Sequence, residues 1–387
     1  MIKAKRLVPE KYRMIDTGET NKFLYFGKSR NMLAYAGKFA VPLLAAGLLL
    51  AGCTGENGPA KEENTVSEQQ QTTEPAVNGT QEVDGAGNTE ESKETLRRIG
   101  GKDVADSLLV GEYERMYAQF SDDLKKAVTL DQFRSMGKSF TANMTSFELT
   151  SDMRLNGYEH FVWANPEGTK GLSATLDDKS MIAGIQILEL PAFPATDAAY
   201  SKTKFQPPFE GDWLVFWGGH NTFLNYHYEH EQVRYAYDLI VERDGFSYQG
   251  DPTKNESYFA FGQNVLAPAD GVVVAVVDGI PDNEPVGQMN EAQPAGNMII
   301  IRHENGEFSM IAHFKNGSIV VQEGDRLRAG QVIGQCGNSG NSSEAHIHFQ
   351  VSPPSEVEDI ATTIPVSFQS GAKPVRGNTL TGVKPSP

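Results

Sequence analysis

Apolar residues recur at helical spacing in one part of the chain and in short strand-like runs in the next. Between residues 104 and 120 they follow the 3.6-residue period of an amphipathic helix. A second helix is predicted from Thr129 to about Met144, because Thr129 and Gln132 can form a capping box. Strand-like runs follow at 160–164, 172–177 and 181–190. We therefore predict a small α+β domain, without an assigned role, over residues 96–192.

The next region consists almost entirely of short β segments separated by turns rich in Gly, Asn and Asp. The expected strands are 213–217, 235–241, 271–277, 297–303, 308–313, 319–321, 332–335 and 345–351. Many short strands with turn signals between them are typical of an antiparallel sandwich or a partly open barrel. We predict such a β domain over residues 205–368, followed by an irregular, proline-containing tail over 369–387.

A run of small and apolar residues from 40 to 52 ends at Leu50-Ala51-Gly52-Cys53. The run is too short to span a bilayer comfortably and has the length of a secretory hydrophobic region. Its ending resembles a bacterial lipobox, in which the cysteine is lipidated. The resemblance implies a lipoprotein signal region over 1–52 and a lipid anchor on Cys53. We accordingly expect attachment to the cell membrane on its extracytoplasmic face. An incidental cysteine in a short apolar segment is the alternative.

Residues 53–95 are rich in Glu, Gln, Thr, Asn and Gly and lack aromatic residues. Ten acidic residues against two lysines give this segment a net charge of −8. Such a composition cannot bury enough apolar surface to fold, so we predict a disordered acidic tether. The whole chain carries −16, and the first 52 residues carry +6, which leaves −22 for the rest. This charge argues against a nucleic-acid partner.

The chain has two cysteines, Cys53 and Cys336. If Cys53 is lipidated, no disulfide can form within the chain and a cysteine-based zinc site is excluded. Cys336 lies in a turn region, where we interpret it as a small packing residue rather than a nucleophile.

Histidines are concentrated in the predicted β domain, which contains seven of the eight in the chain. His346 and His348 are two residues apart in a strand-like segment, so they are expected to project from the same face. Two imidazoles on one face suit a zinc site. His303 follows an isoleucine run, and we interpret it as a surface residue at a strand end.

Several short patterns occur in a fixed order through the β domain. A turn at 267–271 opens a valine-rich strand, a strand ends in His313, and a hairpin spans 323–334. A glycine-rich turn at 337–342 then leads to His346-Ile347-His348-Phe349. In this order and spacing they resemble the lysostaphin/LytM-type zinc metallopeptidases, which cleave peptide bonds in bacterial cell walls. The resemblance covers about residues 205–353.

The resemblance implies a Zn²⁺ ion held by one upstream histidine, one aspartate and the second histidine of the pair. By that resemblance Asp238 and His348 would bind zinc, and His313 and His346 would be the catalytic histidines. The substrate would be the peptide part of peptidoglycan.

The position four residues before Asp238, where the family has its first zinc ligand, is Arg234. Arg cannot bind a metal ion. The upstream segment contains an Asn-x-His element, and His227 is the first choice for the missing ligand. His230 and His220 are the alternatives, and a site without any third protein ligand also stays open.

The leading hypothesis is a membrane-anchored extracytoplasmic zinc metalloendopeptidase that acts on peptidoglycan cross-links. The alternative is a catalytically inactive LytM-like module that binds the cell wall or activates another wall hydrolase, which would then be its partner. A solute-binding lipoprotein is a third interpretation, although the chain lacks a two-lobe α/β pattern.

Overall fold

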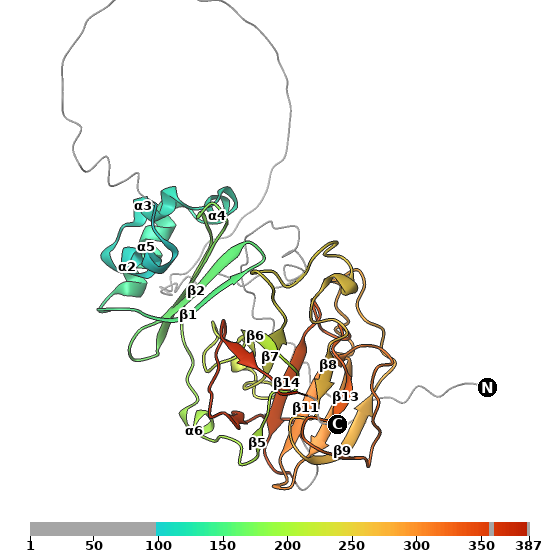
Figure 1. The fold of residues 1–387 in the computed structure, drawn as a ribbon. Coiled ribbons are helices and arrows are strands. Elements are labelled where there is room, and N and C mark those ends of the chain that lie inside the picture. Colours follow the sequence, from blue (N-terminus) through green and yellow to red (C-terminus); the bar gives the residue numbers. More distant parts are fainter. Residues whose placement is uncertain (1–97, 356–359, 385–387) are drawn as a thin grey trace, which may run out of the picture. The chain divides into compact units, whose positions relative to one another are not determined.

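The structure is a computed structural model that describes residues 98–355 and 360–384 (Figure 1). The predicted signal region, Cys53 and the acidic tether lie outside the described residues. Within those residues, no helix combines the length and the hydropathy that crossing a bilayer requires.

Within the described residues, the first region begins with five short helices, whereas the sequence predicted two longer ones. They are η2 (Gly101–Asp103), α2 (Val104–Val110), α3 (Tyr113–Ala118), α4 (Asp122–Ala127) and α5 (Leu130–Thr141). The expected helix over 104–120 is interrupted at Gly111, which adopts a left-handed conformation with φ of 84° and ends α2. The helix after Thr129 is confirmed, and both hydrogen bonds of its capping box are present.

A four-stranded antiparallel meander follows the helices, in the order β1-β2-β3-β4. Its strands are β1 (Glu148–Leu155), β2 (Tyr158–Ala164), β3 (Lys170–Leu176) and β4 (Ile182–Glu189). The sequence did not predict β1, because only alternate residues near its end, such as Met153 and Leu155, are apolar and buried. The helices and the sheet share one core that includes Met116, Phe120 and Leu172. The predicted α+β class of this region is confirmed.

The second region is built mainly from antiparallel strands, as predicted. Its largest sheet has eight strands in the order β12-β9-β10-β11-β14-β7-β6-β16 (Figure 1). These are β6 (Asp212–Trp217), β7 (Tyr237–Ile240), β9 (Gly271–Val277), β10 (Asn297–Arg302), β11 (Phe308–Phe314), β12 (Arg326–Leu327), β14 (Ile347–Ser352) and β16 (Thr379–Thr381). Two small sheets pair β13 (Val332–Gln335) with β8 (Asn264–Leu266) and β15 (Ser367–Phe368) with β5 (Lys204–Phe205). Short helices η3 (Tyr226–Glu229), η4 (Asn255–Ser257) and α6 (Pro194–Asp197) lie in the connections.

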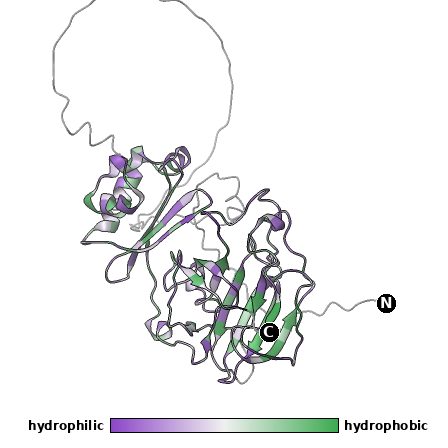
Figure 2. Cartoon of the chain, viewed as in Figure 1, coloured by the Kyte–Doolittle hydropathy of each residue, from purple (hydrophilic) through white to green (hydrophobic). Residues whose placement is uncertain are grey.

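The central strands of this sheet are hydrophobic along most of their length (Figure 2). All seven residues of β11 and all six of β14 are buried. Complete burial of Phe349 alone contributes on the order of 2 kcal/mol to stability. Cys336 lies in the same core at 1% exposure, which confirms its interpretation as a packing residue. This core makes β14 a rigid support for the side chains at its start.

Two predictions for this region are wrong in detail. Residues 319–321 form no strand, and the predicted irregular tail contains β16, which pairs with β6 at the sheet edge. The apolar residue of β16 that the sheet buries is Leu380, at 5% exposure. A single buried residue in a proline-containing segment gives too weak a pattern to predict a strand.

Candidate metal centre

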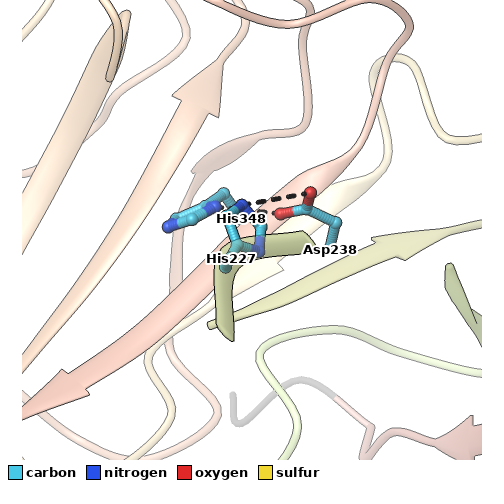
Figure 3. Close-up of side chains that lie close together, drawn as sticks. All are labelled: His227, Asp238 and His348. Carbon is cyan, nitrogen blue, oxygen red and sulfur yellow. Dashed lines mark hydrogen bonds and ion pairs between the residues drawn. The ribbon is translucent and has the colours of Figure 1, made fainter. Parts of the chain in front are cut away.

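Three side chains from separate elements converge near the start of β14. His227 comes from η3, Asp238 from β7 and His348 from β14 (Figure 3). Strands β7 and β14 are neighbours, and His348 lies directly opposite Asp238 in their register. One nitrogen or oxygen atom of each residue lies within 4.8 Å of the others. The structure thus brings together the three residues that the sequence predicted first as ligands.

The carboxylate of Asp238 is the centre of this group. Its Oδ1 atom lies 2.9 Å from Nδ1 of His348, and its Oδ2 atom lies 3.6 Å from Nε2 of His227. The rings of His227 and His348 are almost perpendicular, with centroids 5.1 Å apart. All three residues are at most 4% exposed. Two nitrogens and one carboxylate oxygen in a buried space are a donor set that zinc prefers.

His313 and His346 lie beside the group. Their ring centroids are 4.6 Å apart, and the His313 centroid is 5.8 Å from that of His348. Nε2 of His346 is 3.7 Å from Oδ1 of Asp238. Contrary to prediction, His346 precedes β14, which begins at Ile347, but its ring still faces the same site. The four histidines and Asp238 therefore form one cluster.

Backbone carbonyls hold the second pair of rings through Nδ1. His313 Nδ1 donates to Ser339 O at 2.7 Å, and His346 Nδ1 donates to Glu344 O at 2.8 Å. His313 has a positive φ of 65°, a conformation that non-glycine residues seldom adopt and that often marks a functional position. Both imidazoles consequently present Nε2 as the free nitrogen.

Burial and the shared carboxylate set the protonation of the cluster. Burial lowers the pKa of His227 to about 3, and it also lowers the pKa values of His313 and His346. Burial alone would raise the pKa of Asp238, but His227 and the other nearby imidazoles outweigh it and keep that pKa low. In His348 the hydrogen bond and charge of Asp238 outweigh burial and raise the pKa. The site thus combines one anionic carboxylate with mostly neutral imidazoles, as metal binding requires.

The alternative first ligands lie elsewhere. His230 is exposed, and His220 stacks on Tyr228 with its Nδ1 atom 3.9 Å from Asp197. Arg234, at the family's usual ligand position, is 8% exposed. Its guanidinium lies 3.5 Å from the ring centroid of Phe193, and its Nε donates to Tyr228 O. Arg234 therefore braces the segment that carries His227.

The interpretation of His303 as a surface residue is wrong. It is 3% exposed, and both ring nitrogens are hydrogen-bonded, Nδ1 to Asp270 O and Nε2 to Ser309 Oγ, each at 2.8 Å. Pattern analysis could not reveal this burial, because the partner Asp270 lies 33 residues away in the sequence. The carboxylate of Glu344 faces Ser247 Oγ at 3.4 Å, and only its backbone carbonyl contacts the histidine cluster, through His346.

Two amide side chains in contact with the cluster were not predicted to have a role. Asn225 lies two residues before His227, and Gln350 lies two residues after His348 on the same face of β14. For Gln350 the sequence did contain a signal, because a residue two positions after His348 on a strand is expected on the same face. The Asn-x-His pattern led to the prediction of His227, but it gave no role to Asn225.

A known family profile matches part of this region. Residues 257–359 match the sequence profile of "Peptidase family M23". The match confirms the predicted lysostaphin/LytM-type resemblance for this segment, which carries His313, His346 and His348. His227 and Asp238 lie upstream of the matched residues.

Curated relatives match over short segments. The chain is 29% identical over 89 residues to Peptidoglycan DD-endopeptidase ShyC of Vibrio cholerae, covering 23% of this chain and 19% of the relative. It is 34% identical over 90 residues to Murein hydrolase activator NlpD of Escherichia coli, covering 23% and 20%. The chain thus spans about a fifth of the length of these relatives. The catalytic domain of lysostaphin from Staphylococcus simulans is 19% identical, covering 45% of this chain and 95% of that domain, at a TM-score of only 0.23.

Proposed function

We propose that the chain is a zinc metalloendopeptidase that cleaves peptide bonds of peptidoglycan cross-links. The observation that carries the proposal is the convergence of His227, Asp238 and His348, with the free Nε2 atoms of two further histidines beside them. His227, Asp238 and His348 would hold the metal ion. When bound, zinc supplies Lewis acidity towards a carbonyl group and lowers the pKa of a water molecule.

His346 and His313 would handle the protons of the reaction. Each is neutral and keeps its Nδ1 proton on a backbone carbonyl, so Nε2 can accept a proton from an attacking water molecule. The resulting imidazolium can then donate to the leaving amine or to the developing oxyanion. The hydrogen bond from Nδ1 to a backbone carbonyl keeps each Nε2 directed into the cluster.

The substrate assignment draws on the family match and on the relatives. ShyC is a peptidoglycan endopeptidase by name, and the matched segment of this chain includes three of the four clustered histidines. We further propose that a lipid on Cys53 and the tether over 53–95 keep the enzyme at the extracytoplasmic face of the membrane, within reach of the wall. The strongly acidic chain is expected to have no nucleic-acid partner.

A non-catalytic module that activates another wall hydrolase is the second candidate. It is favoured by the similarity to NlpD, a murein hydrolase activator by name, and by Arg234 at the usual ligand position. Against it, Nε2 of His227 lies 3.6 Å from Oδ2 of Asp238, where it can replace the ligand that Arg234 cannot supply. An activator has no need for four histidines around one carboxylate.

Metal analysis of the full chain separates the two candidates. We expect about one zinc per chain in the parent protein, loss of zinc in His227→Ala and His348→Ala, and retention in His230→Ala, which removes an exposed neighbour. The parent should also release peptides from purified peptidoglycan, with new amino and carboxyl ends seen by mass spectrometry. A parent protein without zinc after metal supplementation would overturn the enzyme proposal.

A further inference from the structure

Of the three imidazoles that face Asp238, those of His227 and His348 each have the other ring nitrogen against a buried amide side chain. Nδ1 of His227 lies 2.9 Å from Oδ1 of Asn225, and Nε2 of His348 lies 2.9 Å from Oε1 of Gln350. Asn225 is 0% exposed and Gln350 is 1% exposed. These amides are thus part of the buried structure around the cluster.

The orientation of the Asn225 amide is determined by three further hydrogen bonds. Its Nδ2 donates to Arg234 O at 3.2 Å and to Ala236 O at 3.0 Å. Its Oδ1 also accepts the backbone N–H of His227 at 3.1 Å. A flipped amide would place Nδ2 against that N–H and Oδ1 against two carbonyls, so Oδ1 must face the ring. Nδ1 of His227 therefore carries the proton, and Nε2 is left for Asp238 or a metal ion.

Gln350 contacts the other type of ring nitrogen, Nε2 of His348. Its Nε2 donates to Gln232 O at 3.2 Å, which turns Oε1 towards the imidazole. Nε2 of His348 must then carry a proton, and Nδ1, which donates to Oδ1 of Asp238 at 2.9 Å, is the nitrogen that must lose its proton to bind a metal ion. The two histidines hence present different nitrogens to the same carboxylate.

We propose that Asn225 and Gln350 are positioning residues that hold a proton on Nδ1 of His227 and on Nε2 of His348, so that the opposite nitrogen of each ring is the one that can bind a metal ion. The inference rests on the proposed zinc site and extends it to side chains that do not touch the metal. A ring nitrogen that carries a proton cannot bind a metal ion, so the wrong tautomer removes a ligand. Loss of a hydrogen-bond partner of this kind typically weakens metal binding by about 10–100-fold.

Zinc affinity of the full chain, measured by competition with a chromophoric chelator, tests the Gln350 half. We expect Gln350→Met, which has a similar length but no acceptor oxygen, to weaken zinc binding by about 10–100-fold. Gln350→Glu keeps the acceptor and should retain most of the affinity. The matched control is Gln206→Met, since Gln206 is buried at 8% exposure and donates to Ala267 O, away from the cluster.

A purely structural role predicts a different result. Gln350→Met and Gln350→Glu would then lower thermal stability without separating in zinc affinity. Equal affinities in the parent protein, Gln350→Met and Gln206→Met would overturn the proposal.

Nitrogen-15 NMR of the metal-free full chain tests the Asn225 half without zinc. We expect the Nδ1–H tautomer at His227 in the parent protein and in Asn225→Asp, which keeps the acceptor, and a mixture of tautomers in Asn225→Leu. A proton on Nε2 of His227 in the parent would overturn the proposal. A parent chain that shows the expected tautomer but binds no zinc would refute the zinc peptidase and leave the positioning role of Asn225 supported.

Discussion

His160 and His348 are both buried histidines on antiparallel strands, one in each folded region. Nδ1 of His160 contacts the hydroxyl of Thr175 at 3.1 Å, whereas Nδ1 of His348 contacts the carboxylate of Asp238 at 2.9 Å. Burial lowers the pKa of His160 to about 3, but Asp238 raises the pKa of His348 despite similar burial. The neighbouring group, rather than the degree of burial, distinguishes a packed imidazole from one equipped for chemistry.

The two regions also differ in how many histidines they contain and in the charge of the groups that those histidines contact. His160 is the one histidine of residues 96–192, and its partner is neutral. In the β region three histidines face a single aspartate and His313 packs beside them, on a sheet whose central strands β11 and β14 are fully buried. A rigid apolar sheet can hold such a polar cluster because packing fixes the strands while hydrogen bonds satisfy the ring nitrogens.

Removing the carboxylate is the strongest test of this contrast. We expect Asp238→Asn to weaken zinc binding by more than the about 10–100-fold that is typical of losing a ligand's hydrogen-bond partner, and to abolish peptidoglycan cleavage, since the metal loses its anionic ligand. His160→Gln should leave zinc content and cleavage unchanged. Metal analysis after dialysis checks both variants, and retention of zinc by Asp238→Asn would refute the assignment of Asp238.

The second pair of histidines should separate metal binding from catalysis. We expect His313→Ala and His346→Ala to keep about one zinc per chain and to lose roughly 100- to 10,000-fold in kcat, the usual share of general acid–base catalysis. His220→Gln is the control, because His220 lies outside the cluster. If either catalytic variant loses its zinc, that residue would be reassigned as a ligand.

His160 itself should make the protein sensitive to acid. Its folded pKa of about 3 lies below its ordinary value, so the unfolded state binds the proton first as the pH falls. Its contribution is complete above about pH 6.5 and is lost by roughly 1.4 kcal/mol per pH unit below that value. His160→Gln should show a correspondingly shallower loss of the free energy of unfolding between pH 6 and pH 4 in urea titrations. Identical slopes in parent and variant would contradict a buried neutral His160.

The smallest expected effect concerns the helix cap in the first region. Thr129 Oγ1 accepts the backbone N–H of Gln132 at the start of α5. Thr129→Ala should destabilise the protein by about 1 kcal/mol, and Thr129→Ser should restore most of it. Thermal unfolding measures the change, and zinc content should stay the same in both variants. A loss of zinc in Thr129→Ala would show that the two regions are not independent in this respect.

Local patterns were sufficient to predict much of the fold. The capping box predicted α5, and runs of β-branched residues predicted β9 and β13 with their observed bounds. Strand β1 and the C-terminal β16 were missed because few of their residues are apolar. Their stability comes from pairing with β2 and β6, which no local pattern reveals.

By itself, the sequence determined the order of the motifs, and the family resemblance of that order predicted Asp238, His313, His346 and His348 for the candidate site. It left His227, His230 and His220 open as the remaining ligand, because spacing along the chain does not determine distance in space. Only the tertiary structure brought His227 to Asp238 and gave Arg234, Asn225 and Gln350 their supporting contacts. Those contacts join η3, β7 and β14, and the packing and pairing of these elements depend on the whole β region.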